Sequence, residues 1–84
     1  MTTNFIFPCE YPLKIIGKAD SLETITLPIL RKHFPDLGEA AIKIRTSQDQ
    51  KYLSMTVNLH ATSKAQLDAL YQDLTAQKEI LMVL

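Results

Sequence analysis

Residues 51–60, KYLSMTVNLH, decide the fold, because apolar and polar side chains alternate along this stretch. The apolar set is Leu53, Met55, Val57 and Leu59. The polar-side set is Tyr52, Ser54, Thr56, Asn58 and His60. Successive side chains of a β-strand point to opposite faces of a sheet. The alternation therefore predicts a strand with one face against a core and one face left open.

Shorter patterns on the N-terminal side of this strand predict its neighbours. Residues 41–45, AIKIR, also alternate and predict a strand, with the polar residues 46–50 as a hairpin turn leading into residues 51–60. Residues 13–18, LKIIGK, are rich in β-branched side chains and predict the first strand of the fold.

A helix is predicted between the strands at residues 13–18 and 41–45, and it contains a proline. It opens at Asp20, with Glu23 three residues later as in a capping box, and it ends near Phe34. Pro28 lies inside this helix, but on a helical wheel it falls opposite the apolar side chains. Proline has no N–H to donate to the carbonyl of Thr24. We therefore expect its ring to face solvent while packing of the apolar side stabilises the helix.

The C-terminal part of the chain predicts a second helix and a last strand. Ser63 and Gln66 have the spacing of a capping box at a helix start. A core stripe at helical spacing follows, formed by Leu67, Leu70, Tyr71 and Leu74. Residues 80–84, ILMVL, are all apolar and predict a strand buried between neighbouring strands.

The order strand, helix, strand, strand, helix, strand leaves few possible topologies. Right-handed crossovers place both helices on the same face of the sheet. We therefore predict the α+β class, a ferredoxin-like βαββαβ sandwich with a four-stranded antiparallel sheet and two helices on one face. The 84 residues are expected to form a single domain, with residues 1–11 as an N-terminal arm and residues 12–84 as the sandwich.

Composition excludes several classes of protein. Nine Lys and Arg balance nine Asp and Glu, which argues against strong non-specific binding of nucleic acid by the whole molecule. Cys9 is the only cysteine, so an internal disulfide and a CxxC site are excluded, and a lone thiol suits a reducing compartment. No apolar run is long enough to span a membrane, and residues 1–8 do not resemble a signal peptide. We expect a cytoplasmic protein with no membrane partner.

The open face of the sheet is the candidate binding surface. By strand alternation it should carry the six candidate site residues Lys14, Lys18, Lys43, Arg45, Tyr52 and His60. Four of these are cations, and almost no acid accompanies them. The face could bind an anion, an acidic partner or nucleic acid, or it could be a solvated face or half of a homodimer interface. Nucleic acid is disfavoured because only Tyr52 is available for stacking on bases.

The two histidines do not have the spacing of a metal site, so neither a metal nor another cofactor is expected. His33 follows Arg31 and Lys32 near the end of the first helix, where cations complement the helix dipole. His60 has no visible nucleophile beside it in the sequence. No catalytic residue is predicted from these positions.

Several segments together resemble one family. They are FP at residues 7–8, KIIG at 14–17, KHFP at 32–35, LYQDL at 70–74 and ILMVL at 80–84. In these segments the chain is similar to the YbeD-like family of small bacterial proteins. The resemblance implies a βαββαβ sandwich similar to the regulatory ACT domain, and a regulatory role linked to lipoate metabolism. His60 departs from the family pattern, which usually has Asn at that position. The resemblance carries over no catalytic residue.

Enzymes that share this fold require residues that the chain lacks. Acylphosphatases bind phosphate after the first strand with an Arg, whereas residues 17–21 here contain no Arg and include Asp20. Copper chaperones place a CxxC motif there. We therefore expect no enzymatic activity, and favour a regulatory or binding module acting on a protein partner or small ligand. An anion or nucleic-acid binder is the alternative, and a small hydrolase is the least favoured reading.

Overall fold

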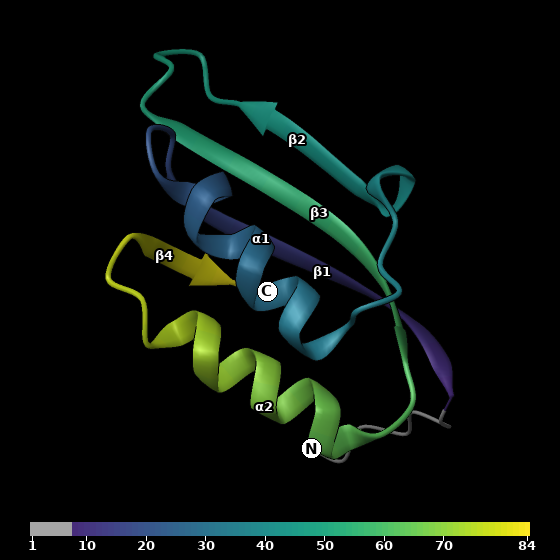
Figure 1. Ribbon diagram of the computed structural model, residues 1–84. Coiled ribbons are helices and arrows are strands. Elements are labelled where there is room, and N and C mark those ends of the chain that lie inside the picture. The colour runs from purple at the N-terminus through teal and green to yellow at the C-terminus, as the bar shows by residue number, and fades with distance from the viewer. Residues whose placement is uncertain (1–7) are drawn as a thin grey trace.

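The structure is a computed structural model that describes residues 8–84. Its elements are β1 (Cys9–Lys18), α1 (Leu22–His33), the short 3-10 helix η1 (Glu39–Ala41), β2 (Ile42–Thr46), β3 (Tyr52–Ala61), α2 (Lys64–Thr75) and β4 (Ile80–Val83). The strands form one antiparallel sheet in the order β2-β3-β1-β4. Both helices lie on the same face of this sheet (Figure 1). The predicted α+β sandwich is confirmed.

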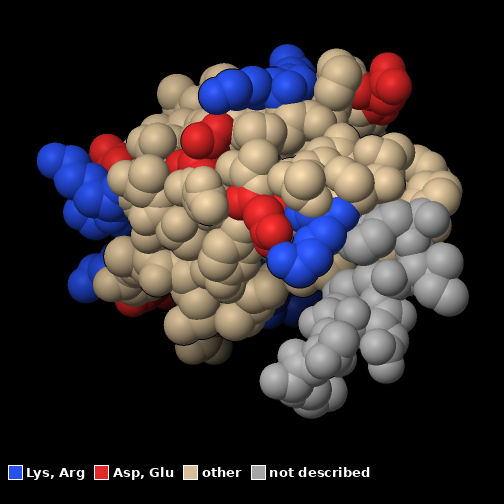
Figure 2. Space-filling model, turned by 90° about the horizontal axis from the view of Figure 1, so that it is seen from below, with Lys and Arg blue, Asp and Glu red and all other residues tan. Residues whose placement is uncertain are grey.

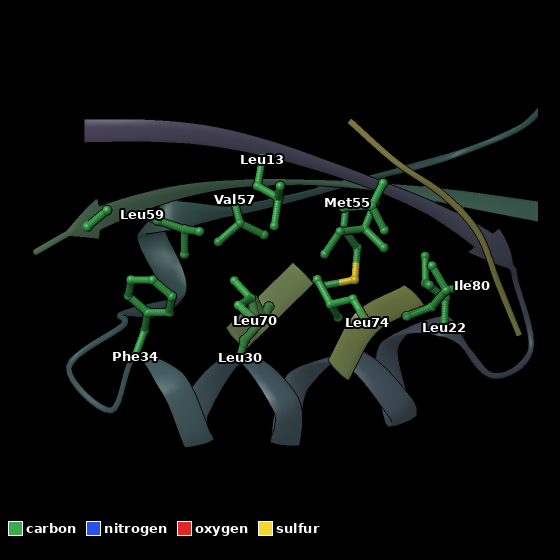
Figure 3. Close-up of a cluster of buried hydrophobic side chains, with 13 residues drawn as sticks. Leu13, Leu22, Leu30, Phe34, Met55, Val57, Leu59, Leu70, Leu74 and Ile80 are labelled. Carbon is green, nitrogen blue, oxygen red and sulfur yellow. The ribbon is translucent and has the colours of Figure 1, made fainter. Parts of the chain in front are cut away.

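The core lies between the sheet and the two helices (Figure 3). Met55, Val57 and Leu59 of β3 are fully buried and Leu53 is half-buried, as the alternation predicted. From α1 the buried residues are Leu22, Thr26 and Leu30, while Pro28 is exposed on the opposite side, also as predicted.

The start of α1 differs from the prediction. Ser21, and not Asp20, occupies the N-cap position, and its side chain makes no capping hydrogen bond. The backbone after β1 is already held by two bonds, from Ala19 N–H to the Lys51 carbonyl at 2.9 Å and from Ser21 N–H to the Lys18 carbonyl at 3.2 Å. This tight turn places the helix start at Leu22, one residue later than a cap at Asp20 would place it.

The start of α2 follows the prediction, but one member of its stripe does not. Ser63 Oγ accepts a hydrogen bond from the Gln66 N–H at 3.1 Å. Leu70 and Leu74 are fully buried, whereas Tyr71 is 45% exposed, so its assignment to the core was wrong. The Tyr71 hydroxyl donates to the Val83 carbonyl at 2.9 Å. This bond holds the ring at the margin of the core, beside β4.

Two predicted strand boundaries and the predicted position of the last strand in the sheet are corrected. β1 begins at Cys9, so residues 9–11 of the expected arm belong to the sheet, while residues 1–7 lie outside the described residues. Ala41 lies in η1 and not in β2. Among the strands that the structure describes, β4 is an edge strand that pairs only with β1, so it is not buried between neighbours. Leu81 and Met82 of β4 are exposed, and so is Leu84, which follows the strand.

Pro12 lies inside β1 without interrupting the sheet. The backbone groups of Lys14 point towards β4, because Lys14 and Leu84 exchange two hydrogen bonds of 3.1 and 2.8 Å. Backbone direction alternates along a strand, so the nitrogen of Pro12 points to the same side. Lys14 and Leu84 form the last pair on that side. Within residues 8–84 no ladder bond is therefore lost at Pro12.

Candidate binding surface on the open sheet face

The strand register brings the four predicted cations together. Lys43 of β2 and Lys14 of β1 both lie opposite Thr56 of β3, so the three residues form one row across the sheet. In the next row Arg45 lies opposite Ser54. One row further along the strands, Lys18 lies opposite Tyr52. We call the surface formed by Lys14, Lys18, Lys43 and Arg45 the basic face.

The cations of the basic face are exposed and lack anionic partners among residues 8–84. The ion pairs within residues 8–84 involve Lys32, His33, His60 and Lys64, and none of the four cations. Neighbouring strands are about 4.8 Å apart, so cations that flank one strand are roughly 10 Å apart. That separation is about one Debye length at ordinary salt concentration, so their repulsion is only partly screened. An anion placed on this face would meet several cations at once.

The basic face is hollowed between β2 and β1. Lys14, Arg45 and Tyr52 contribute to the lining of a hollow of about 210 Å³. Drug-sized ligands usually occupy pockets of roughly 300–1,000 Å³. The hollow therefore suits a small anionic group, such as a carboxylate side chain, better than a large cofactor.

An apolar strip borders the basic face on the β4 side. Met82 pairs with Ile16 of β1. Ile16 is half-buried, while Met82 and Leu84 are exposed. A partner that covered the cations from this side would therefore also meet apolar side chains.

His60 does not join the basic face. It pairs with Glu10, and its Nδ1 atom lies 3.7 Å from the Glu10 Oε1 atom, with both side chains exposed. Four residues along β3 separate His60 from Thr56, which is roughly 13 Å. His60 instead borders a groove of about 500 Å³ that also contacts Asp36 and Gln66. Two acids, Glu10 and Asp36, line this groove, so its chemistry differs from that of the basic face.

The other histidine joins the two helices. His33 Nε2 lies 2.6 Å from Asp73 Oδ2, and Lys32 Nζ lies 3.2 Å from the same oxygen. The hydrogen bond from His33 lowers the pKa of Asp73, and Lys32 adds to this effect. The position of His33 in the sequence predicts an interaction with the helix dipole but not the contact with Asp73. Asp73 lies on the second helix, and no spacing along the chain relates it to His33.

The side of the molecule on which α2 lies carries a different charge pattern. Figure 2 shows the molecule from below, the side on which α2 lies in Figure 1, and both acidic and basic side chains occupy this view. On the four strands, by contrast, Glu10 is the only acidic residue.

Within residues 8–84 no group of three or more His, Cys, Asp or Glu is placed to hold a metal ion. No helix in this part of the chain is long and apolar enough to cross a membrane.

The fold and its open face define a small βαββαβ sandwich protein. Comparison with known families is specific: the family described as "Protein of unknown function (DUF493)" matches residues 2–84, and the chain belongs to this family. A UPF0250 protein of Chromobacterium violaceum is 41% identical over 81 residues, covering 95% of this chain and 91% of that protein. A UPF0250 protein of Nitrosomonas europaea is 38% identical over 79 residues, covering 93% and 91%. The expected membership in the YbeD-like family is confirmed.

A solved structure shares the fold. The solution structure of protein HP0495 from H. pylori matches with a TM-score of 0.73 and 16% sequence identity. The match covers 99% of this chain and 88% of that chain. At this identity the likeness concerns the fold alone.

Proposed function

We propose that this protein is a non-enzymatic binding module that takes an anionic partner on the basic face. The observation that carries the proposal is the set of exposed cations on β1 and β2, the two strands that flank β3, with no acidic partner among the described residues. Cations that flank β3 at roughly 10 Å repel each other, and ordinary salt screens this repulsion only in part. An anionic partner would relieve this repulsion and gain charge-assisted hydrogen bonds.

A second copy of the chain is a poorer occupant of this face. Two basic faces packed against each other would bring together two sets of four cations, and Glu10 is the only acidic residue on the four strands of each copy. Charge complementarity between partners favours encounter, whereas like charges in contact are costly. The homodimer alternative is therefore less well supported than an acidic partner.

The hydrolase alternative has little support at the loop where phosphate would bind. The backbone N–H groups of Lys18, Ala19 and Ser21 donate to the carbonyls of Glu79, Lys51 and Lys18. A phosphate cradle needs free N–H groups. The side chain of Asp20 would also repel phosphate in this loop.

The family resemblance supports a regulatory setting for this binding. A module that binds without turning over its ligand fits the ACT-like role that the resemblance implies, and lipoate metabolism is the candidate process. The lone thiol of Cys9 suits the reducing cytoplasm.

The test compares two variants that remove the same charge. Lys43→Gln with Arg45→Gln changes the basic face, while Arg31→Gln with Lys78→Gln removes two exposed cations elsewhere that form no ion pair within residues 8–84. Binding of a fluorescent polyglutamate peptide is measured at low and high salt. We expect the first variant to bind more weakly than the second, with the larger difference at low salt.

Two results would contradict the proposal. Equal binding by the two variants would show that the basic face is not the binding surface. Unfolding of the Lys43 and Arg45 variant would show that these charges are structural. Single-stranded DNA of equal length serves as a competing probe, and tighter binding of DNA than of polyglutamate would favour the nucleic-acid alternative.

A further inference from the structure

The two edges of the sheet differ in how their outward backbone groups are used. On β4 the Val83 carbonyl points away from β1, because its neighbour Leu84 bonds to Lys14. The Tyr71 hydroxyl donates a hydrogen bond to that carbonyl at 2.9 Å. The helix α2 runs beside this edge (Figure 1). The β4 edge is therefore partly closed by the protein itself.

The β2 edge is open. Ser47 N–H donates to the Tyr52 carbonyl at 2.9 Å, which fixes the direction of the β2 backbone. By alternation the backbone groups of Lys43 and Arg45 point towards β3, and those of Ile44 and Thr46 point outward. Within residues 8–84 no hydrogen bond uses the outward groups of Ile44 or Thr46. Such a row of free donors and acceptors can pair with an added strand.

The side chains of β2 present different chemistry on the two faces. Lys43 and Arg45 lie on the basic face, in register with Thr56 and Ser54. Ile44 lies on the opposite face, opposite Met55, yet it is 42% exposed because β2 is at the edge of the sheet. A strand added beside β2 would therefore meet cations on one face and an apolar side chain on the other.

We infer that an extended acidic segment of a partner protein adds to β2 as a fifth strand of the sheet. Its acidic side chains would lie beside Lys43 and Arg45, and its apolar side chains would cover Ile44. The period of two along a strand then requires a segment in which acidic and apolar residues alternate. This inference rests on the proposed function and names the partner of the same surface.

A second copy of this chain does not meet this requirement. If two β2 strands paired about a two-fold axis perpendicular to the sheet, Lys43 and Arg45 of both copies would share one face. Like charges on directly opposed strands are destabilising. A partner with acidic residues at these positions has the complementary charge.

The probe is an eight-residue peptide that alternates glutamate and valine, and its affinity is measured by fluorescence anisotropy. Thr46→Pro removes one outward N–H and leaves the bonds to β3, because proline is tolerated where its nitrogen faces away from the partner strand. Thr46→Val retains the N–H and is the matched control. We expect Thr46→Pro to bind roughly two- to tenfold more weakly than Thr46→Val, the range expected for one lost hydrogen bond.

Hydrogen exchange gives a direct second readout. On peptide binding the amides of Ile44 and Thr46 should become protected, whereas those of Lys43 and Arg45 are already bonded to β3 and should change less. A peptide N-methylated at alternate residues cannot donate to the β2 edge and should bind more weakly. If Thr46→Pro fails to fold, hydrogen exchange and the N-methylated peptide still test strand addition, because both measurements use the native protein.

The outcomes separate this inference from the proposed function. If the Lys43 and Arg45 variant weakens peptide binding but Thr46→Pro and N-methylation do not, the basic face binds anions without strand addition, and only the inference is overturned. Failure of the native protein to bind the alternating peptide also overturns the inference. If it fails to bind polyglutamate as well, the proposed function is overturned too.

Discussion

His33, at the end of α1, donates a hydrogen bond to Asp73 of α2, with His33 Nε2 and Asp73 Oδ2 2.6 Å apart. The same helix ends are also joined by Gln66, whose Nε2 donates to the His33 carbonyl at 3.0 Å. These contacts fix how the two helices lie relative to each other above the core.

Replacing Asp73 with Asn should lower the melting temperature at neutral pH. The His33 hydrogen bond lowers the Asp73 pKa from its ordinary value of 3.8, so the folded state favours the carboxylate. The resulting stabilisation is fully present above about pH 4 and is lost as the pH falls through the lowered pKa. The difference in melting temperature between the native protein and Asp73→Asn should therefore become smaller as the pH is lowered. Melting curves recorded between pH 2 and 7 measure this difference, and Asp68→Asn serves as the exposed control. The prediction is wrong if Asp73→Asn lowers the melting temperature by the same amount at every pH.

Gly17 should not tolerate a side chain. A Cβ atom at this position would lie 2.6 Å from the Glu79 carbonyl oxygen and 2.7 Å from Leu22 Cδ1. Such overpacking typically costs about 1–3 kcal/mol, so Gly17→Ala should lower the free energy of unfolding by that amount in urea titrations. Gly38→Ala is the matched control, because nothing lies within 4 Å of its added Cβ and its φ is −92°. If Gly17→Ala were as stable as Gly38→Ala, the prediction would be wrong. That result would show that Glu79 and Leu22 can move away from the added Cβ atom without loss of stability.

Thr26→Val should stabilise the fold. Thr26 is completely buried, and its hydroxyl has no hydrogen-bond partner among the described residues. A buried hydroxyl without a partner costs about 1–3 kcal/mol, and valine has nearly the same shape. We expect a gain within that range in urea unfolding. Thr26→Ser, which retains the hydroxyl and loses a methyl group, should be less stable than the native protein. A loss of stability in Thr26→Val would mean that the hydroxyl has a partner.

Pro28→Ala should also stabilise the protein. Pro28 lies inside α1 with its side chain exposed, so the change removes no core contact. Alanine restores an N–H that can bond to the Thr24 carbonyl, and proline is about 3 kcal/mol less favourable than alanine inside a regular helix. The expected gain in the free energy of unfolding is up to that amount. Thr24→Ala, also exposed on α1, should gain at most about 0.7 kcal/mol. A destabilised Pro28→Ala would show that the proline ring packs on the fold.

Side-chain alternation along β3 predicted which face of the sheet is buried, and the same parity placed Lys14, Lys18, Lys43 and Arg45 on the other face. Both follow from the two-residue period of an extended chain. The helical period of 3.6 residues, together with the capping residues, identified α1 and α2, including the exposed position of Pro28. These features depend on residues that are close together in the sequence, so the sequence is sufficient to predict them.

The sequence did not predict the features that depend on which elements become neighbours. The apolar run at residues 80–84 has the composition of a central strand, yet within the described part of the chain β4 lies at the edge of the sheet and pairs only with β1. Tyr71 has core spacing, but its hydroxyl bonds to Val83 on that edge. His33 and Asp73, 40 residues apart, meet only because the helices pack together. The open β2 edge and the separation of His60 from the basic face likewise follow from strand order and register, which contacts between distant residues decide.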